Sequence, residues 1–259
     1  MILSFSKYHG AGNDFVIIDN RSGFFIKRTE LIKNLCDRHF GIGADGLMLL
    51  ETSTKADFHM RYYNSDGNES TMCGNGGRCI TLFAHKLGLI GTNTNFLGID
   101  GEHIANLEDE KIVNLKMQAI KGIEIGSDYY FINTGSPHYV CFVNDVNKVD
   151  VNREGKRIRN SFNLVNGGTN VNFVDLSQNL INIRTYERGV ESETLACGTG
   201  SVASAIAVSH QTKSNKSEYS INTQGGKLTV KFNKINDFEY NEIWLKGPAM
   251  HVFDGQIII

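Results

Sequence analysis

The sequence predicts an α+β protein built from two similar halves, and three observations support this prediction. A Cys-Gly-x-Gly motif occurs at residues 73–76 and again at residues 197–200. The spacing of 197 − 73 = 124 residues is close to half of the 259-residue chain. Short runs typical of β-strands dominate both halves, and each motif opens a stretch typical of an α-helix. Together these observations indicate an internal duplication.

The residues upstream of the two motifs repeat as well. A turn and strand at residues 12–16 have a counterpart at residues 135–140, with an offset of 135 − 12 = 123. We therefore expect each half to contribute one cysteine to a shared cleft, where two thiols can act on opposite faces of one carbon atom. The aromatic and acidic residues that lie eleven and four positions before each motif cysteine are Tyr62 and Glu69 in the first half and Tyr186 and Glu193 in the second.

The charge and composition of the chain exclude several classes of partner. The 26 basic and 28 acidic residues give a formal net charge of −2, so no strong field recruits nucleic acid or an anionic membrane. No apolar run approaches the ~20 residues that span a bilayer, and the first residues lack the apolar core of a secretion signal. Five cysteines without a secretory context predict reduced thiols in the cytoplasm.

The first half is predicted to combine short strands with two helices. The helix expected at residues 29–40 has Thr29 as its N-cap and Gly41 after its end. The helix expected at residues 76–86 is followed by Gly88, a residue type that commonly ends helices. The strands expected in this half cover residues 15–19, 47–50, 58–63 and 112–117.

The strand pattern restarts after residues 119–122, where we expect the two halves to meet without a flexible linker. The second motif opens a helix at residues 199–209 that is rich in alanine and valine. Residues 228–232 alternate between apolar and polar side chains, as a half-buried strand does. The other strands expected in this half cover residues 129–132, 138–143, 171–174 and 181–186.

A cysteine at the start of a helix has a specific chemical consequence. Unpaired N–H groups and the positive end of the helix dipole stabilise a thiolate, and such positions lower a cysteine pKa from ~8.5 to ~3.5–7.5. Gly74 and Gly198 leave the helix amides open to a carboxylate. A carbon acid beside that carboxylate would lie between the sulfurs of Cys73 and Cys197. One thiolate would then remove a proton while the other thiol delivers one.

The other cysteines and one glycine motif have structural interpretations. Cys36, Cys79 and Cys141 are expected to be small buried side chains. Five residues separate Cys73 from Cys79, and no paired histidines accompany them, which disfavours a zinc site. Residues 41–46 match Gly-x-Gly-x-x-Gly, but a helix precedes and a strand follows them, the reverse of a dinucleotide-binding loop. We therefore expect no metal site, and a turn at residues 41–46.

Several polar residues have both a structural and a functional interpretation. His138 follows a proline and is either a satisfied structural histidine or a catalytic partner. Arg188 either forms a solvated turn with Glu187 or clamps a carboxylate through two hydrogen bonds. Asparagines in glycine-flanked turns commonly bond to their own backbone, and this interpretation applies to Asn13, Asn64 and Asn170.

The chain resembles one family, the diaminopimelate epimerases, nearly from end to end. Both halves carry the paired catalytic cysteines of that family at the matching points. The most specific matching segments are residues 64–67 with 73–79 and residues 186–189 with 196–200, and residues 7–15, 38–46, 169–173 and 253–255 also match. The resemblance implies an α+β fold of two similar, pseudo-symmetric domains. Each would be a barrel-like, mostly antiparallel sheet around a central helix, with the active site in the cleft between them.

The domain bounds implied by the resemblance follow from the last strand, which would return to the first domain. The first domain would comprise residues 1–117 plus 250–259 and contain Cys73. The second would comprise residues 118–249 and contain Cys197. A homodimer is a further expectation from the family.

The activity implied by the resemblance is epimerisation of LL-2,6-diaminopimelate to the meso isomer, a precursor of lysine and peptidoglycan, without a cofactor or metal. Cys73 and Cys197 would be the acid and the base, with roles that exchange with direction. His138 and Glu187 would support the cysteines or the amino group. The residues expected to hold the substrate are Asn13, Asn64, Gly74, Asn75, Asn170, Glu187, Arg188, Gly198 and Thr199.

Two positions depart from the family pattern, and other functions stay open. Some members have glutamine in place of Gly46 and asparagine in place of Ser136, where these side chains contact the substrate. The nearest alternative is a proline-racemase-like enzyme, which Asn75 and the pair at residues 187–188 disfavour. A thiol-dependent hydrolase would use one cysteine with a histidine. An amino-acid-binding protein would exchange no α-proton.

Overall fold

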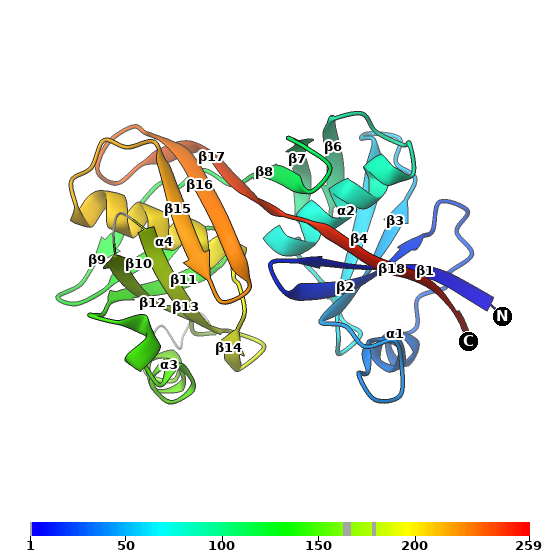
Figure 1. Cartoon of the computed structure of the whole chain (residues 1–259), viewed down its shortest axis with the longest axis horizontal. Coiled ribbons are helices and arrows are strands. Elements are labelled where there is room, and N and C mark those ends of the chain that lie inside the picture. Colours follow the sequence, from blue (N-terminus) through cyan, green and yellow to red (C-terminus); the bar gives the residue numbers. More distant parts are fainter. Residues whose placement is uncertain (1, 163–166, 178–179) are drawn as a thin grey trace. The chain divides into compact units, whose positions relative to one another are not determined.

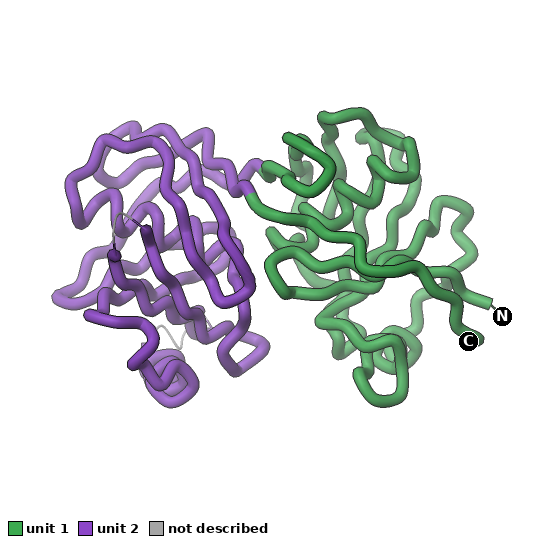
Figure 2. Tube along the Cα trace, viewed as in Figure 1, with its two compact units in different colours: residues 1–115, 247–259 green, residues 116–246 purple. Residues whose placement is uncertain are grey.

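The computed structural model describes residues 2–162, 167–177 and 180–259 (Figure 1). The chain folds into two compact units, the first made of Met1–Leu115 with Gly247–Ile259 and the second of Lys116–Lys246 (Figure 2). Strands dominate both units, and the described residues contain four α-helices, which confirms the predicted α+β class.

The first unit contains two helices and a sheet. Its elements are β1 (Ile2–Gly10), β2 (Asn13–Asp19), α1 (Thr29–Cys36), β3 (Gly46–Glu51), β4 (Phe58–Asn64), β5 (Glu69–Ser70), α2 (Gly74–Lys86), β6 (Asn93–Gly98), β7 (Gly101–Leu107), β8 (Ile112–Lys116) and β18 (Met250–Ile258). The sheet order is β18-β1-β2-β3-β4-β6-β7-β8, with β5 paired to β4. The pairs β2/β3 and β4/β6 are parallel, and the others are antiparallel.

The second unit is built in the same way. Its elements are β9 (Glu124–Ile125), β10 (Tyr130–Asn133), β11 (Pro137–Phe142), the 3₁₀ helix η1 (Val146–Lys148), α3 (Val151–Arg159), β12 (Asn170–Ser177), β13 (Leu180–Glu187), β14 (Ser192–Thr194), α4 (Gly198–Gln211), β15 (Glu218–Thr223), β16 (Gly226–Lys234) and β17 (Tyr240–Pro248). The sheet order is β9-β10-β11-β12-β13-β15-β16-β17, with β14 paired to β13. The pairs β11/β12 and β13/β15 are parallel.

The two sheets repeat one pattern of pairings. When β1 is matched with β10 and β2 with β11, the first parallel pair is β2/β3 in one unit and β11/β12 in the other. The second is β4/β6 in one unit and β13/β15 in the other. The helix α2 follows the β4–β5 hairpin as α4 follows the β13–β14 hairpin. This repetition is the internal duplication that the sequence predicts.

Strand register identifies equivalent positions in the two units. Phe15 lies opposite the first residue of β3, and His138 lies opposite the first residue of β12, so these two residues correspond. Met48 and Asn172 are the third residues of those two strands and therefore correspond as well. The equivalence matters because these four side chains lie on the face of each sheet that the inner helix covers.

The match between Tyr62 and Tyr186 is wrong by one residue. Tyr63 pairs with Glu69 across the first hairpin, and Tyr186 pairs with Glu193 across the second. The second hairpin therefore has one more residue between the paired positions, and Tyr186 corresponds to Tyr63. A shift of one residue moves a side chain to the other face of a sheet, so a constant distance from the cysteine was misleading upstream of the hairpin.

The inner helix of each unit is almost entirely buried. Every residue from Gly74 to Ala84 of α2 is buried, and α4 is buried from Gly200 to Ser209. Figure 1 shows each of these helices among the strands of its own unit. A helix that is buried on all sides carries apolar and small residues around its circumference, which explains the alanine and valine content of α4. Gly88 has a φ of +68° just after α2, so it ends the helix as the sequence predicts.

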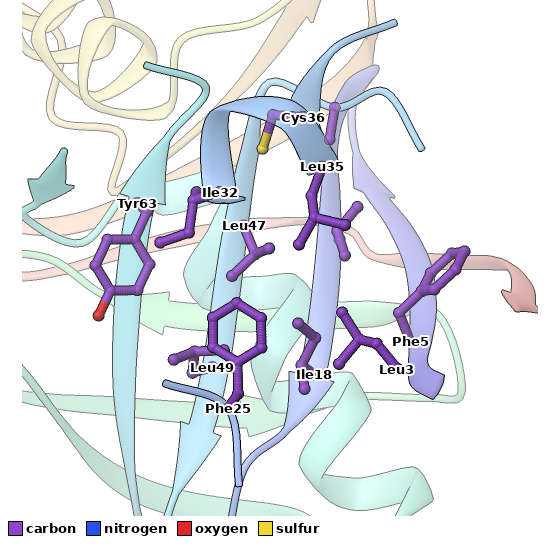
Figure 3. Packing of buried hydrophobic residues seen from close by; sticks show 12 residues of the cluster. Leu3, Phe5, Ile18, Phe25, Ile32, Leu35, Cys36, Leu47, Leu49 and Tyr63 are labelled. Atoms are coloured by element: carbon purple, nitrogen blue, oxygen red, sulfur yellow. The ribbon is translucent and has the colours of Figure 1, made fainter. Parts of the chain in front are cut away.

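The outer helices cover the opposite faces of the sheets. In the first unit α1 packs on β2 and β3 through the cluster that Figure 3 shows, which includes Ile18, Ile32, Leu35 and Leu47. In the second unit α3 packs on β12 and β13 through Val151, Ile158, Val171, Phe173 and Tyr186. Because helices cover both faces, β2, β3 and β12 are buried over most of their length.

The ends of α1 differ from the sequence prediction. The N-cap is Arg28 and makes no side-chain cap hydrogen bond, so Thr29 is the first helical residue. The helix ends at Cys36 because Asp37 adopts an extended conformation, and its carboxylate accepts the N–H groups of His39 and Phe40 at 2.7 and 2.8 Å. An aspartate that bonds to the following backbone competes with helix continuation.

The helix α3 was not predicted from the sequence. Only Val151, Gly155 and Ile158 of this element are buried, so its apolar periodicity is short. Asp150 caps it by accepting the N–H of Arg153. No helix among the described residues is long and apolar enough to span a membrane.

Candidate active site

Each motif cysteine is the N-cap of an inner helix. Cys73 (φ −93°, ψ 133°) precedes α2, and Cys197 (φ −115°, ψ 114°) precedes α4. The first helical hydrogen bonds run from Gly77 N–H to the Cys73 carbonyl at 2.7 Å and from Ser201 N–H to the Cys197 carbonyl at 2.9 Å. The amides of residues 74–76 and 198–200 therefore lie ahead of the helical ladder, where amides attract an anion.

The thiol of Cys73 faces a hydrogen-bond acceptor. Its Sγ lies 3.6 Å from Oδ1 of Asn13, and the same oxygen accepts Nδ2 of Asn75 at 3.3 Å. The Asn13 amide has only one orientation here, because its Nδ2 donates to the carboxylate of Asp45 at 2.6 Å and a carboxylate can only accept. Cys73 thus meets an oxygen that stabilises the protonated thiol.

A charged cluster holds Asp45 in place. Arg38 donates to Asp45 at 2.6 Å and to Asp14 at 2.7 Å, and Lys7 pairs with Asp14 at 2.6 Å. Burial opposes ionisation of Asp14, but the hydrogen bonds from Arg38 and Lys7 outweigh it and keep the pKa of this carboxyl well below its usual range. Asp45 was missed as a site residue in the sequence, where its glycine-rich surroundings indicated only a turn.

The thiol of Cys197 has a different neighbour. Its Sγ lies 3.4 Å from the hydroxyl oxygen of Thr199, and Nε2 of His138 lies 2.9 Å from the same hydroxyl. His138 therefore reaches Cys197 through Thr199. Burial and the nearby charge of Arg188 lower the pKa of His138 to about 3, so the imidazole is neutral at physiological pH.

The loop around Asn170 fixes the polar residues of the second unit. Asn170 Nδ2 donates to Ser136 Oγ at 2.8 Å and to the Pro137 carbonyl at 2.9 Å, and its Oδ1 accepts the backbone N–H of Arg188 at 2.8 Å. Glu187 Oε2 accepts the hydroxyl of Thr194 at 2.9 Å. Asn170 thus positions the Arg188 backbone, while among the described residues the Arg188 guanidinium forms no ion pair.

Two further positions of the first unit differ in exposure, since Asn64 is exposed and Gly46 is buried. Asn64 is exposed at the end of β4, and its backbone N–H donates to the Asn68 carbonyl at 3.0 Å. At Gly46, a Cβ atom would lie 2.6 Å from the Tyr62 ring. The same Cβ would lie 2.6 Å from the Tyr63 carbonyl oxygen, so a larger residue here would require both the Tyr62 ring and the β4 backbone to move.

The other three cysteines differ in how far they are buried. Cys36 and Cys79 are buried as predicted, and burial raises the pKa of Cys36 to about 12 and that of Cys79 still further. Cys141 is only half-buried, which corrects the prediction. It lies near the end of β11, and its Sγ is 3.7 Å from the Asn172 carbonyl. Among the described residues, no cluster of three or more His, Cys, Asp or Glu side chains is arranged to hold a metal ion.

Known structures share this duplicated fold. A phenazine biosynthesis protein of the PhzF family from Bacillus anthracis superimposes with a TM-score of 0.77 and 15% identity, and 100% of each chain is covered. A probable proline racemase from Agrobacterium radiobacter K84 superimposes with a TM-score of 0.74 and 13% identity, covering 99% of this chain and 93% of that one. At such identities the likeness establishes the fold alone.

Sequence comparison identifies the family. The diaminopimelate epimerase family model matches residues 5–116 and 130–252. The diaminopimelate epimerase of Flavobacterium psychrophilum is 52% identical, covering 97% of this chain and 98% of its own. That of Chlorobaculum tepidum is 44% identical, covering 96% and 99%. The chain belongs to the diaminopimelate epimerase family.

Proposed function

We propose that the protein interconverts LL- and meso-2,6-diaminopimelate with two cysteines and no cofactor. The family membership and the 52% identity to a named diaminopimelate epimerase support this reaction. The observation that carries the mechanism is the opposite polarity around the two N-cap thiols. Cys73 faces a carboxamide oxygen, whereas Cys197 faces a hydroxyl group. One thiol and one thiolate are the pair that a two-base epimerisation needs.

In the proposed reaction both steps are proton transfers. The Cys197 thiolate removes the α-proton and becomes a thiol, which leaves a carbanion on the substrate. The Cys73 thiol then delivers its proton to the opposite face and becomes a thiolate. Proton transfers alone balance the reaction, so it consumes no oxidant or reductant, and the reverse direction exchanges the two roles.

The developing carbanion is stabilised through the carboxylate beside it. Negative charge spreads onto the carboxylate oxygens, and the helix-start amides at residues 74–75 and 198–199 would donate to them. Such preorganised donors commonly account for a large part of a rate enhancement. The second requirement is exclusion of water, which strengthens these interactions.

The far end of the substrate carries an ammonium and a carboxylate, and we assign polar groups to each. Arg188, whose backbone is held by Asn170, would bind the distal carboxylate. Glu187 and Asn64, which lie at the ends of β13 and β4, would accept hydrogen bonds from the ammonium group. A site that forms hydrogen bonds with the second amino-carboxylate rejects substrates that lack it.

The substrate assignment is tested by proton NMR of the reduced protein in D₂O with LL-diaminopimelate, with chiral analysis of the product. Loss of the α-proton signal with formation of the meso isomer is expected. A parallel sample with proline tests the racemase alternative. Exchange on proline but not on diaminopimelate would overturn the substrate assignment, and exchange on neither would leave a binding or hydrolytic role.

A homodimer in the cytoplasm is part of the same proposal. The β18 strand exposes Val252 and Ile258 by 53% and 82%, and Ile2, which pairs with Ile258, is 63% exposed. Exposed apolar side chains on neighbouring strands are candidates for a protein interface. Light scattering should give twice the 28.8 kDa chain mass, and Val252→Glu should shift it toward one chain. A single-chain mass for the unaltered protein would remove the dimer.

A further inference from the structure

The sheet beneath Cys197 carries polar side chains where the sheet beneath Cys73 does not. The inner face of β11 and β12 presents His138 and Asn172 toward the start of α4. Both side chains are completely buried. Buried polar groups cost stability unless they are hydrogen-bonded. The donors and acceptors of these two side chains must therefore be matched to their neighbours.

The directions of these hydrogen bonds follow from a contact with a backbone carbonyl. Asn172 has one side-chain atom 3.1 Å from the Tyr139 carbonyl oxygen, and a carbonyl can only accept, so that atom is Nδ2. The same Nδ2 lies 3.1 Å from Nδ1 of His138. The opposite oxygen, Oδ1, accepts the hydroxyl of Thr185 at 3.0 Å, which agrees with this orientation of the amide.

This orientation of Asn172 selects one tautomer of His138. Because Nδ2 donates to it, Nδ1 of His138 is the unprotonated nitrogen, and Nε2 carries the proton. Nε2–H then donates to the Thr199 hydroxyl oxygen at 2.9 Å. The hydroxyl oxygen is occupied as an acceptor, so its own proton is directed to the next neighbour, the Cys197 sulfur at 3.4 Å.

The last glycine of the second motif is explained by the same contact. A Cβ at Gly200 would lie 2.4 Å from Oδ1 of Asn172 and 3.3 Å from Cβ of Cys197. Asn172 therefore occupies the space that a Cβ at residue 200 would need. Its position is set by three groups, the Tyr139 carbonyl, the Thr185 hydroxyl and the Gly200 backbone.

The first unit indicates that the fold does not require these polar groups. Phe15 and Met48 occupy the positions equivalent to His138 and Asn172. A Cβ at Gly76 would lie 3.3 Å from the Met48 sulfur and 3.6 Å from the Phe15 ring. An apolar pair thus supports one inner helix, so the polar pair below the other has a purpose beyond packing.

We propose that Asn172 is a positioning residue that, through His138, directs the Thr199 hydroxyl proton to the Cys197 sulfur and so favours the thiolate there. Four hydrogen bonds form a relay from the fixed Tyr139 carbonyl to the Cys197 sulfur. A hydrogen bond to a charged group is stronger than one to a neutral group, so a hydroxyl held as a donor favours S⁻ over SH. The catalytic benefit of the relay rests on the proposed function, but the relay itself does not.

The relay is tested first at Thr199 by the pH dependence of Cys197 alkylation, read by mass spectrometry of its peptide. Thr199→Val removes the donor, so alkylation at neutral pH should slow on the order of tenfold and the midpoint should rise by about one pH unit. Thr199→Ser should keep the profile of the unaltered protein. Ser201→Ala is the matched control, because the Ser201 hydroxyl bonds to the Cys197 carbonyl at 2.9 Å and not to the sulfur.

The role of Asn172 is tested by Asn172→Met, which installs the residue that the first unit has at this position. Long-range proton–nitrogen NMR of labelled histidine should show His138 as the Nε2–H tautomer in the unaltered protein. In Asn172→Met that tautomer should no longer dominate, and Cys197 alkylation should slow as in Thr199→Val. An unaltered His138 that is protonated on Nδ1 would overturn the relay.

The outcomes separate the relay from the proposed function. If diaminopimelate is epimerised but Thr199→Val and Asn172→Met alkylate like the unaltered protein, the relay is wrong and the function stands. If the alkylation profiles shift but no epimerisation occurs, the relay stands and the function is wrong. Circular dichroism checks the folding of each variant. If Asn172→Met does not fold, the relay is tested by the comparison of Thr199→Val with Thr199→Ser and by the tautomer of His138 in the unaltered protein.

Discussion

The two units share one fold but surround their N-cap cysteines with opposite chemistry. In the first unit the Asn13 side-chain oxygen lies next to the Cys73 sulfur, and the apolar side chains of Phe15 and Met48 pack below the helix start. In the second unit the Thr199 hydroxyl lies next to the Cys197 sulfur, and the polar side chains of His138 and Asn172 lie below the helix start. Identical strand order therefore does not imply identical sites. The difference supports the proposal that one thiol is protonated while the other is ionised.

The largest expected effect comes from removing either sulfur. Cys73→Ala and Cys197→Ala should each lower epimerisation by at least about a thousandfold, because each leaves one face of the carbon without a proton donor or base. Chiral analysis of the product measures this. Cys36→Ala, which alters a buried cysteine of the outer core, is the control and should keep near-normal turnover. Normal turnover in either motif variant would contradict the two-thiol mechanism.

The motif glycines provide a matched pair for stability. Gly200→Ala should lower the free energy of unfolding by roughly 1–3 kcal/mol, because its Cβ would lie 2.4 Å from Asn172 Oδ1. Gly76→Ala should be within about 1 kcal/mol of the unaltered protein, because the flexible Met48 side chain can move and alanine favours the helix. Urea unfolding measures both. Equal losses of unfolding free energy would indicate that the side chains below the two helix starts pack alike.

The buried histidine should make stability depend on pH. In the folded protein His138 stays neutral down to a pKa of about 3, whereas the unfolded chain binds a proton near pH ~6.5. The unfolded state therefore binds more protons in this range, and stability falls as pH drops from about 6.5 toward 3.

The size of this effect is measured by urea unfolding at pH 7 and pH 5. His138 should contribute a loss of about 2 kcal/mol over that interval, at 1.36 kcal/mol per unit. His138→Phe, which copies the first unit, should lose less stability between the two pH values than the unaltered protein. An identical loss in both would mean that His138 is accessible to protons in the folded state.

A smaller effect is expected at Asp45. Asp45→Asn removes the carboxylate that fixes the Asn13 amide, so the amide can turn and present its NH₂ group to Cys73. Epimerisation should fall by about tenfold, since one hydrogen bond to the reacting group is weakened. Asp19→Asn, which removes a carboxylate paired with Arg21, is the control. An effect no larger than the control would show that Asn13 keeps its orientation without Asp45.

The sequence predicted much of this architecture because its signals were local. Glycine and the strand-like runs placed α2, α4 and half of the strands among the described residues to within a few residues, and the duplicated motif identified both N-cap cysteines. The motifs also identified the family. These features depend on backbone preference and short-range periodicity, which a single chain displays directly.

What the sequence did not reveal depends on pairing between distant strands. The correspondence of Tyr186 with Tyr63 requires the hairpin lengths, and the roles of Asn172 and Asp45 require their neighbours. Asn172 is one of many asparagines, so composition gave no reason to single it out. The helix α3 was missed because only a few of its residues are buried.

The most direct test of two thiols in opposite protonation states is the isotope content of substrate and product during the first turnovers in D₂O. LL-diaminopimelate is converted to a few per cent, and both isomers are then separated and examined by mass spectrometry. The account predicts one deuterium in the meso product and protium in the recovered LL substrate, because one thiolate removes the proton and a different, solvent-equilibrated thiol delivers deuterium. Deuterium in the recovered substrate at the same rate, or a product that retains protium, would indicate a single base and contradict the account.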